Sequence, residues 1–245
     1  MKFKAVLLAT VLGACLGVIP QTNFAHAEST ISCPSGQYDM LDWMTLDSDL
    51  RGSQHMTGTA NPLYSTMYSD KFYWVKGGNG YPWDIQLYDN NFIYLWITEY
   101  SWNDPKSYKK FSNNYNMPLT NRCAKGGFPG STITVPNTSY EIYTSCTNSS
   151  SHTLKQAVNQ VWGPYNLSLG GILPKNTPTL VVSYRYNCDS TYSNCGDKEE
   201  YYLQQRYGLV QWIHYTLVNG SYDQQQKSVF NTMKSGTAIP DFQCF

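Results

Sequence analysis

The chain has 245 residues, of which 17 are Lys or Arg and 17 are Asp or Glu. This balance of charge gives no electrostatic reason to expect nucleic acid or an anionic membrane surface as a partner. Tyr and Trp are frequent, at 21 and 7 residues, and because aromatic side chains both suit β-strands and stack on sugars, packing and carbohydrate binding are both open explanations.

The first 27 residues have the pattern of an export signal. Two lysines precede an apolar run too short to span a membrane, and residues 25–27 read Ala-His-Ala, a small-residue cleavage site. We therefore predict a signal peptide over residues 1–27 and a secreted mature domain, extracellular or periplasmic, over residues 28–245. A lipobox ending at Cys15 is the alternative, and it would leave a lipid anchor as the one membrane attachment. Cleavage after residue 27 removes two lysines and no acid, so the mature net charge is −2 (15 minus 17).

Six cysteines follow the predicted signal peptide. An even number of cysteines behind an export signal predicts disulfides formed in an oxidising compartment. We expect a nested pairing, because two bonds would then close local loops and the third would tie the chain ends together. The expected bonds are Cys33–Cys244, Cys123–Cys146 and Cys188–Cys195. The cysteines and histidines do not have metal-ligand spacing, so neither a metal nor a cofactor is predicted.

A three-stranded meander is predicted between residues 70 and 100. Turn sequences at residues 77–80 and 89–91 separate three runs rich in aromatic and β-branched residues. Because side chains alternate between the two faces of a strand, the runs sort into an aliphatic face and an aromatic, polar face. The aliphatic face, which we expect in the core, carries Tyr73, Val75, Trp83, Ile85, Leu87, Ile93, Leu95 and Ile97. The other face carries Phe72, Trp74, Lys76, Asp84, Gln86, Tyr88, Tyr94, Trp96 and Thr98.

The aromatic, polar face of this meander is the candidate binding site. Flat rings beside a carboxylate and an amide are typical of sugar-binding surfaces, because the rings stack on sugar faces while the polar groups bind hydroxyls. The ligand-binding residues predicted on this basis are Trp74, Asp84, Gln86, Tyr88, Tyr94 and Trp96. The alternative is that another layer of the same chain covers this face, in which case the rings serve packing.

The rest of the chain reads as strands and two short helices. Residues 101–131, in which Asn, Pro, Lys and Gly are frequent, are expected to form a long connection. Elsewhere, alternating side chains predict strands and apolar side chains at helical spacing predict helices. The expected strands lie at residues 132–135, 139–146 and 177–188 and as an antiparallel pair within 199–220, and the expected helices at 151–162 and 221–234.

These elements predict one mainly β domain, an antiparallel β-sandwich of the jelly-roll or lectin kind, with two short helices and disulfide staples. Three functions are compatible with it. The first is a secreted carbohydrate-binding protein that uses the aromatic strand face to hold an extracellular glycan. The second is an extracellular carbohydrate-active enzyme: a glycosidase would need two carboxylates, and a polysaccharide lyase would use Arg185, His214 and Tyr215. The third is a secreted structural or interaction protein without a small ligand.

Overall fold

The structure of the protein is a computed structural model. It describes residues 31–45, 55–56, 63–68, 71–76, 82–101, 107–112, 117–169, 173–229 and 233–234. Within these ranges, the description is limited to the backbone at residues 55–56, 63–68, 71–76, 82–83, 99–101, 229 and 233–234. The predicted signal peptide, Cys15, Cys244 and the side chain of Trp74 therefore lie outside the described residues.

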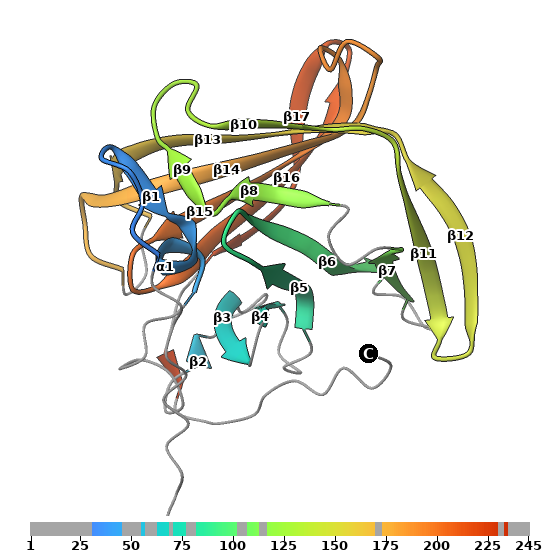
Figure 1. Ribbon diagram of the computed structural model, residues 1–245, viewed down its shortest axis with the longest axis horizontal. Helices are drawn as coiled ribbons and strands as arrows, with labels where there is room; N and C mark the ends of the chain where they lie inside the picture. Colours follow the sequence, from blue (N-terminus) through green and yellow to red (C-terminus); the bar gives the residue numbers. More distant parts are fainter. Residues whose placement is uncertain are drawn as a thin grey trace, which may run out of the picture. The chain divides into compact units, whose positions relative to one another are not determined.

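The prediction of a mainly β protein is confirmed, since 70% of the described residues lie in strands and 3% in helix. A six-stranded antiparallel sheet has the order β10-β13-β14-β15-β16-β17 (Figure 1). Its strands are β10 (Thr132–Val135), β13 (Gln156–Leu167), β14 (Thr177–Cys188), β15 (Cys195–Gln204), β16 (Gly208–Val218) and β17 (Ser221–Val229). The pair β15 and β16 is the hairpin expected within residues 199–220, and β14 is the strand expected at residues 177–188.

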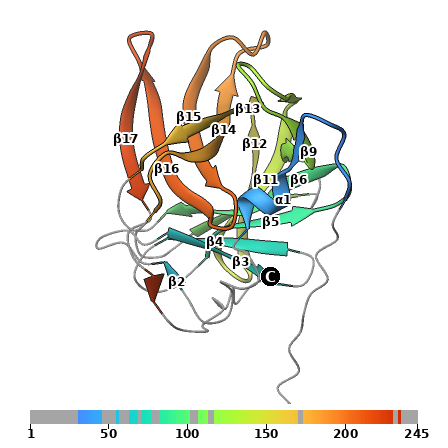
Figure 2. The ribbon, with the colours of Figure 1, turned by 90° about the vertical axis from the view of Figure 1, so that its left-hand side faces the viewer.

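The second large sheet contains eight strands and includes the predicted meander. Its order is β12-β11-β7-β6-β5-β4-β3, and β8 pairs with β6. Its strands are β3 (Leu63–Tyr68), β4 (Lys71–Lys76), β5 (Pro82–Tyr88), β6 (Phe92–Ser101), β7 (Ser107–Phe111), β8 (Pro118–Asn121), β11 (Thr138–Ser145) and β12 (Asn148–Leu154). Figure 2 shows β16 and β17 drawn steeply above β3 and β4, which are drawn nearly level. β7 and β8 lie within residues 101–131, so the segment expected to be a long connection contains strands.

Both large sheets contribute to one hydrophobic core. From the six-stranded sheet come Leu180, Val182, Tyr201, Leu203 and Trp212, among others. From the eight-stranded sheet come Ile93, Leu95, Phe111 and Leu119. Removing these side chains from water stabilises the fold and joins the two sheets through a shared core.

A short N-terminal segment joins this core. It contains β1 (Gln37–Asp39), which pairs with β9 (Cys123–Lys125), and α1 (Met40–Met44). Asp39 caps α1, because its side chain accepts a hydrogen bond from the backbone N–H of Leu41 (3.0 Å). A further two-stranded pair is formed by β2 (His55–Met56) and β18 (Met233–Lys234).

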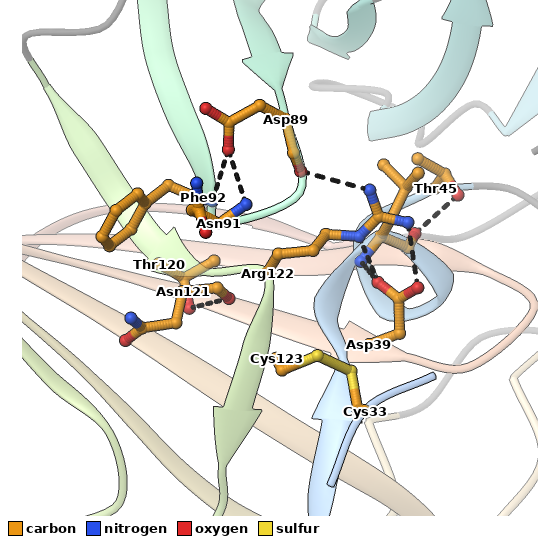
Figure 3. Close-up of polar contacts among 11 residues, drawn as sticks. Cys33, Asp39, Thr45, Asp89, Asn91, Phe92, Thr120, Asn121, Arg122 and Cys123 are labelled. Carbon is orange, nitrogen blue, oxygen red and sulfur yellow. Dashed lines mark hydrogen bonds and ion pairs between the residues drawn. A yellow bond between two sulfur atoms is a disulfide. The ribbon is translucent and has the colours of Figure 1, made fainter. Parts of the chain in front are cut away.

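Arg122 connects this N-terminal segment to the eight-stranded sheet (Figure 3). Its guanidinium forms a two-point contact with Asp39, in which Nη2 donates to Oδ2 at 2.9 Å, and Nη1 reaches the carbonyl of Asp89 at 3.5 Å. Its backbone N–H donates to the carbonyl of Asn91 (2.7 Å), and its carbonyl accepts from the N–H of Met40 (2.8 Å). One buried residue thus ties α1, the β5–β6 turn and the β8–β9 segment together.

Two of the three expected disulfides are wrong. The bond Cys188–Cys195 is present as predicted, whereas Cys33 bonds Cys123 across 90 residues. The reason is the pairing of β1 with β9, which places Asp39 opposite Cys123 and brings the N-terminal cysteine to the same place. Pairing between segments this far apart cannot be read from cysteine spacing.

Cys146 is also disulfide-bonded. The two described bonds fit an oxidising compartment. No helix within the described residues is long and apolar enough to cross a membrane.

Both expected helices are wrong, since residues 151–162 belong to β12 and β13, and residues 221–229 form β17. On β13, Ala157 and Val161 face the main core, while Val158 packs on Cys188 from the opposite face. Because both faces of β13 are buried, apolar residues occur on both faces, and their spacing in the sequence resembles that of a helix. The one helix among the described residues, α1, is five residues long and lies outside both expected helical ranges.

Candidate ligand-binding cavity

The register of β5 and β6 divides the predicted aromatic, polar face. Asp84 lies opposite Thr98, and Gln86 lies opposite Leu95. The register shifts by one residue between these two pairs, so Trp96 of β6 has no opposite residue on β5. Because directly opposed residues share a face, Asp84 and Gln86 lie with Leu95, a core residue. Past this β-bulge the alternation on β6 is inverted, which sequence parity could not show. The predicted separation of aliphatic from polar residues is therefore wrong on β6.

The described side chains of the predicted site do not form an open platform. Asp84, Gln86, Tyr94 and Trp96 are buried, at 1%, 0%, 7% and 9% exposure. Tyr94 and Trp96 pack in a second hydrophobic cluster with Val210 of β16. Tyr88 is half-buried, with its ring 5.4 Å from the Arg122 guanidinium. The chain itself therefore covers Asp84, Gln86, Tyr94 and Trp96.

A different cavity lies between the inner faces of the two large sheets. Its volume is about 330 Å³. It is lined by Leu95, Thr98, Lys109, Tyr140, Leu154, Tyr184, Tyr186, Asn187, Glu199 and Tyr201. Asn187 is exposed and Tyr186 and Glu199 are half-buried, so the cavity reaches solvent at this end of β14.

Strand register brings the polar residues of the six-stranded sheet together. Tyr184 lies opposite Glu199, which in turn lies opposite His214, so all three strands place these side chains on the same face. Alternation adds Tyr186 and Tyr201 two residues along their strands, still on that face. The cavity wall is therefore a local array of tyrosines around one carboxylate.

Glu199 is held by donors from aromatic side chains. The hydroxyl of Tyr201 donates to Glu199 Oε2 at 2.8 Å, and the indole Nε1 of Trp212 donates to the same atom at 2.7 Å. The Glu199 carboxylate also raises the pKa of the Tyr186 hydroxyl, after burial. The two hydrogen bonds fix the carboxylate without neutralising it, because the donors carry no charge.

The tyrosines that surround Glu199 remain protonated. Burial, and then the Glu199 carboxylate, raise the pKa of Tyr184, Tyr186 and Tyr201. The rings of Tyr184 and Tyr186 stack with centroids 4.6 Å apart. The wall thus offers neutral hydroxyl groups and flat rings.

Lys109 of β7 supplies the positive charge on the opposite wall. Its Nζ lies 5.0 Å from the centroid of the Tyr140 ring and 6.0 Å from that of Tyr186, which is within the range of cation–π attraction. Burial lowers the pKa of Lys109, and the carboxylates of Glu199, Asp84 and Asp197 oppose this shift, in that order of size. Asp84 thus contributes to this cavity through its charge.

His214 belongs to the rim of the same array. Its ring stacks on Trp212 (centroids 6.2 Å apart), and its Nε2 lies 3.5 Å from the Tyr186 hydroxyl and 3.6 Å from Asp197 Oδ1. The predicted lyase residues do not converge on it. Arg185 and Tyr215 both lie opposite Lys198 in the register, and hence on the other face of the sheet from His214.

A larger cavity of about 610 Å³ lies elsewhere, between α1 and the β13, β14 and β15 ends. It is lined by Tyr38, Trp43, Pro164, Pro174, Thr177, Pro178, Gln205, Arg206 and Tyr207. Its described lining residues include one charged group, Arg206, and no carboxylate, so it lacks the combination of an acid and a base that distinguishes the smaller cavity. The smaller cavity is therefore the better candidate for selective binding of a polar ligand.

Comparison with known proteins gives no significant match to any protein family, curated protein or solved structure. The site must therefore be interpreted from its own chemistry. Among the described residues, no three His, Cys, Asp or Glu side chains are grouped as metal ligands.

Sequence reasoning missed Lys109, because its strand lies in a segment expected to be a connection. It named Tyr184, Tyr186 and Glu199 only as parts of strands. A signal for them existed. Polar and aromatic residues recur at every second position on three consecutive strands, which predicts a shared wall.

Proposed function

We propose that this protein is exported and binds a carbohydrate in the cavity between its two large sheets, which together form a β-sandwich. The observation that carries the proposal is Glu199, which is fixed by two aromatic donors in a cavity of about 330 Å³ with tyrosine walls. Sugars need this combination, because rings cover their C–H faces while carboxylate, amide and hydroxyl groups bind their hydroxyls.

The composition of the wall favours a sugar over an apolar ligand. Glu199, Asn187, Thr98 and the tyrosine hydroxyls supply hydrogen-bonding groups on several sides. The cavity volume suits the end of a glycan.

The lyase alternative lacks the same support. Arg185 and Tyr215 lie on the face of the sheet opposite His214, so the three groups do not surround one substrate. We therefore propose ligand binding without catalysis.

The proposal can be tested with a glycan array, followed by calorimetry on the glycans that bind. Glu199→Gln removes the charge that the cavity presents, and we expect it to lower affinity at least about tenfold, the effect of losing a charge-assisted hydrogen bond. Near-ultraviolet circular dichroism should show retained folding.

Glu200→Gln is the matched control. Glu200 is the next residue on β15 and also accepts hydrogen bonds from two tyrosines, Tyr202 (2.9 Å) and Tyr215 (3.1 Å), but it is not in the cavity wall. We expect it to leave affinity unchanged. Equal effects of the two substitutions, or no binding to any glycan, would overturn the proposal.

A further inference from the structure

We infer that the cavity selects a ligand with a protonated amine, so that an amino sugar binds more tightly than the matching neutral or acidic sugar. This inference rests on the proposed function and specifies the chemical class of its ligand. Two independent features of the cavity lead to it, namely the balance of charge and the arrangement of rings.

The charges around the cavity have a negative balance. Among the described lining residues, Lys109 is the one base and Glu199 the one acid. Two more carboxylates, Asp84 and Asp197, also act on the Lys109 ammonium. His214 contacts Asp197 at the rim (3.6 Å). A carboxylate ligand would therefore meet repulsion from three acids, whereas an ammonium ligand would be attracted by them.

The aromatic rings are already arranged around a cation. The Lys109 ammonium lies 5.0 Å from the centroid of Tyr140 and 6.0 Å from that of Tyr186. The ring of Tyr184 stacks on that of Tyr186, and the ring of His152 stacks on Tyr140 with centroids 5.5 Å apart. These stacks hold both rings in place, so the faces that attract a cation are fixed before a ligand binds.

The Lys109 side chain thus holds its ammonium at the position where we expect a ligand amine to bind. Its ammonium and a ligand ammonium compete for the same ring faces and the same carboxylates. Removing the Lys109 charge frees the rings and raises the negative potential, and both changes favour an amine. A neutral sugar gains nothing from the more negative potential.

The test uses calorimetry with the mature protein near neutral pH and four matched sugars: glucosamine, N-acetylglucosamine, glucose and glucuronate. We expect glucosamine to bind several-fold more tightly than N-acetylglucosamine, because the carboxylates around the cavity outnumber its one ammonium. Lys109→Met should raise glucosamine affinity several-fold, and Glu199→Gln should abolish the preference. Glu200→Gln serves as the control and should keep it.

The outcomes separate this inference from the carbohydrate proposal. Equal binding of glucosamine and glucose, or a preference for glucuronate, would keep carbohydrate binding and overturn amine selection. Ethanolamine, a hydroxylated amine without a sugar ring, is the second probe. Saturable binding of ethanolamine that Glu199→Gln abolishes, together with no binding of any sugar, would support amine selection and overturn the carbohydrate proposal. If neither sugars nor ethanolamine bind, both are overturned.

Discussion

Two polar clusters at the centre of this protein use the same residue types in different ways. In the Arg122 cluster, the guanidinium and its partner Asp39 are 1% and 9% exposed, and they meet in a two-point contact. In the Lys109 cluster, the ammonium lies against rings at 5.0 and 6.0 Å, and the acid Glu199 is held by neutral donors. The first cluster is closed, whereas the second surrounds a cavity of about 330 Å³.

The difference separates structural from ligand-binding polar groups. A buried ion pair that is fully hydrogen-bonded fixes the geometry of the segments that carry it, and removing one member leaves the other unpaired. A carboxylate fixed by neutral donors keeps its charge available to a third group. We therefore expect substitutions in the Arg122 cluster to change stability and substitutions in the Lys109 cluster to change binding.

The largest effect is expected from Arg122→Met. It leaves the Asp39 carboxylate buried without its cation and disconnects α1 from the β5–β6 turn. We expect a loss of about 3–5 kcal/mol in the free energy of unfolding, the cost of breaking a buried pair by removing one partner. Urea unfolding followed by tryptophan fluorescence measures it. Lys125→Met, at an exposed position on the adjacent strand β9, is the control and should change stability by less than about 0.5 kcal/mol. A loss of similar size in both variants would refute the structural role.

Tyr201→Phe should have an intermediate effect. It removes a hydrogen bond to the Glu199 carboxylate but keeps the buried ring. We expect a loss of about 1.5–3 kcal/mol, because the bond is made to a charged group. Tyr202→Phe removes the corresponding bond to Glu200 and is the control. Both substitutions should lower stability, but only Tyr201→Phe should weaken ligand binding, which calorimetry measures. Equal ligand affinity in the two variants would mean that Glu199 has a structural role.

Lys109→Met should have a smaller effect on stability. Met keeps the apolar stem, so the variant loses a cation–π contact at a half-buried position, which is worth less than about 1 kcal/mol. Thermal and urea unfolding next to Arg122→Met, the same kind of substitution, gives a direct comparison. A cost as large as that of Arg122→Met would show that the Lys109 cluster is structural as well.

The sequence was sufficient to predict strands wherever alternation is strong. Alternation over residues 177–188 predicted β14, and the structure shows which face is inward, since Leu180, Val182, Tyr184 and Tyr186 pack in or against the main core. Alternation failed where both faces are buried, as on β13, and past the bulge at Trp96, because one extra residue reverses the faces.

The candidate site was less predictable, because it depends on contacts between the two sheets. Tyr184 and Glu199 lie on neighbouring strands, so parity could have grouped them. Lys109 and Asp84 come from the other sheet, and their place near Glu199 follows from packing between sheets, which no local pattern reports. The Cys33–Cys123 bond has the same origin, since it depends on the pairing of β1 with β9.

Asp189 provides a reference outside both clusters, because it is a hydrogen-bonded acid in an exposed loop between Cys188 and Cys195. Hydrogen bonds from Thr191, Asn194 and Ser193 lower the pKa of Asp189 to about 2. A lowered carboxyl pKa adds stability that is complete above the ordinary Asp value near about 4 and is lost as the pH falls toward about 2. We expect the carboxyl resonance of Asp189 to titrate near pH 2 in NMR spectra, and Asp189→Asn to remove the pH dependence of stability that this group contributes in that interval. A midpoint near the ordinary value would mean that these bonds are too exposed to hold the charge.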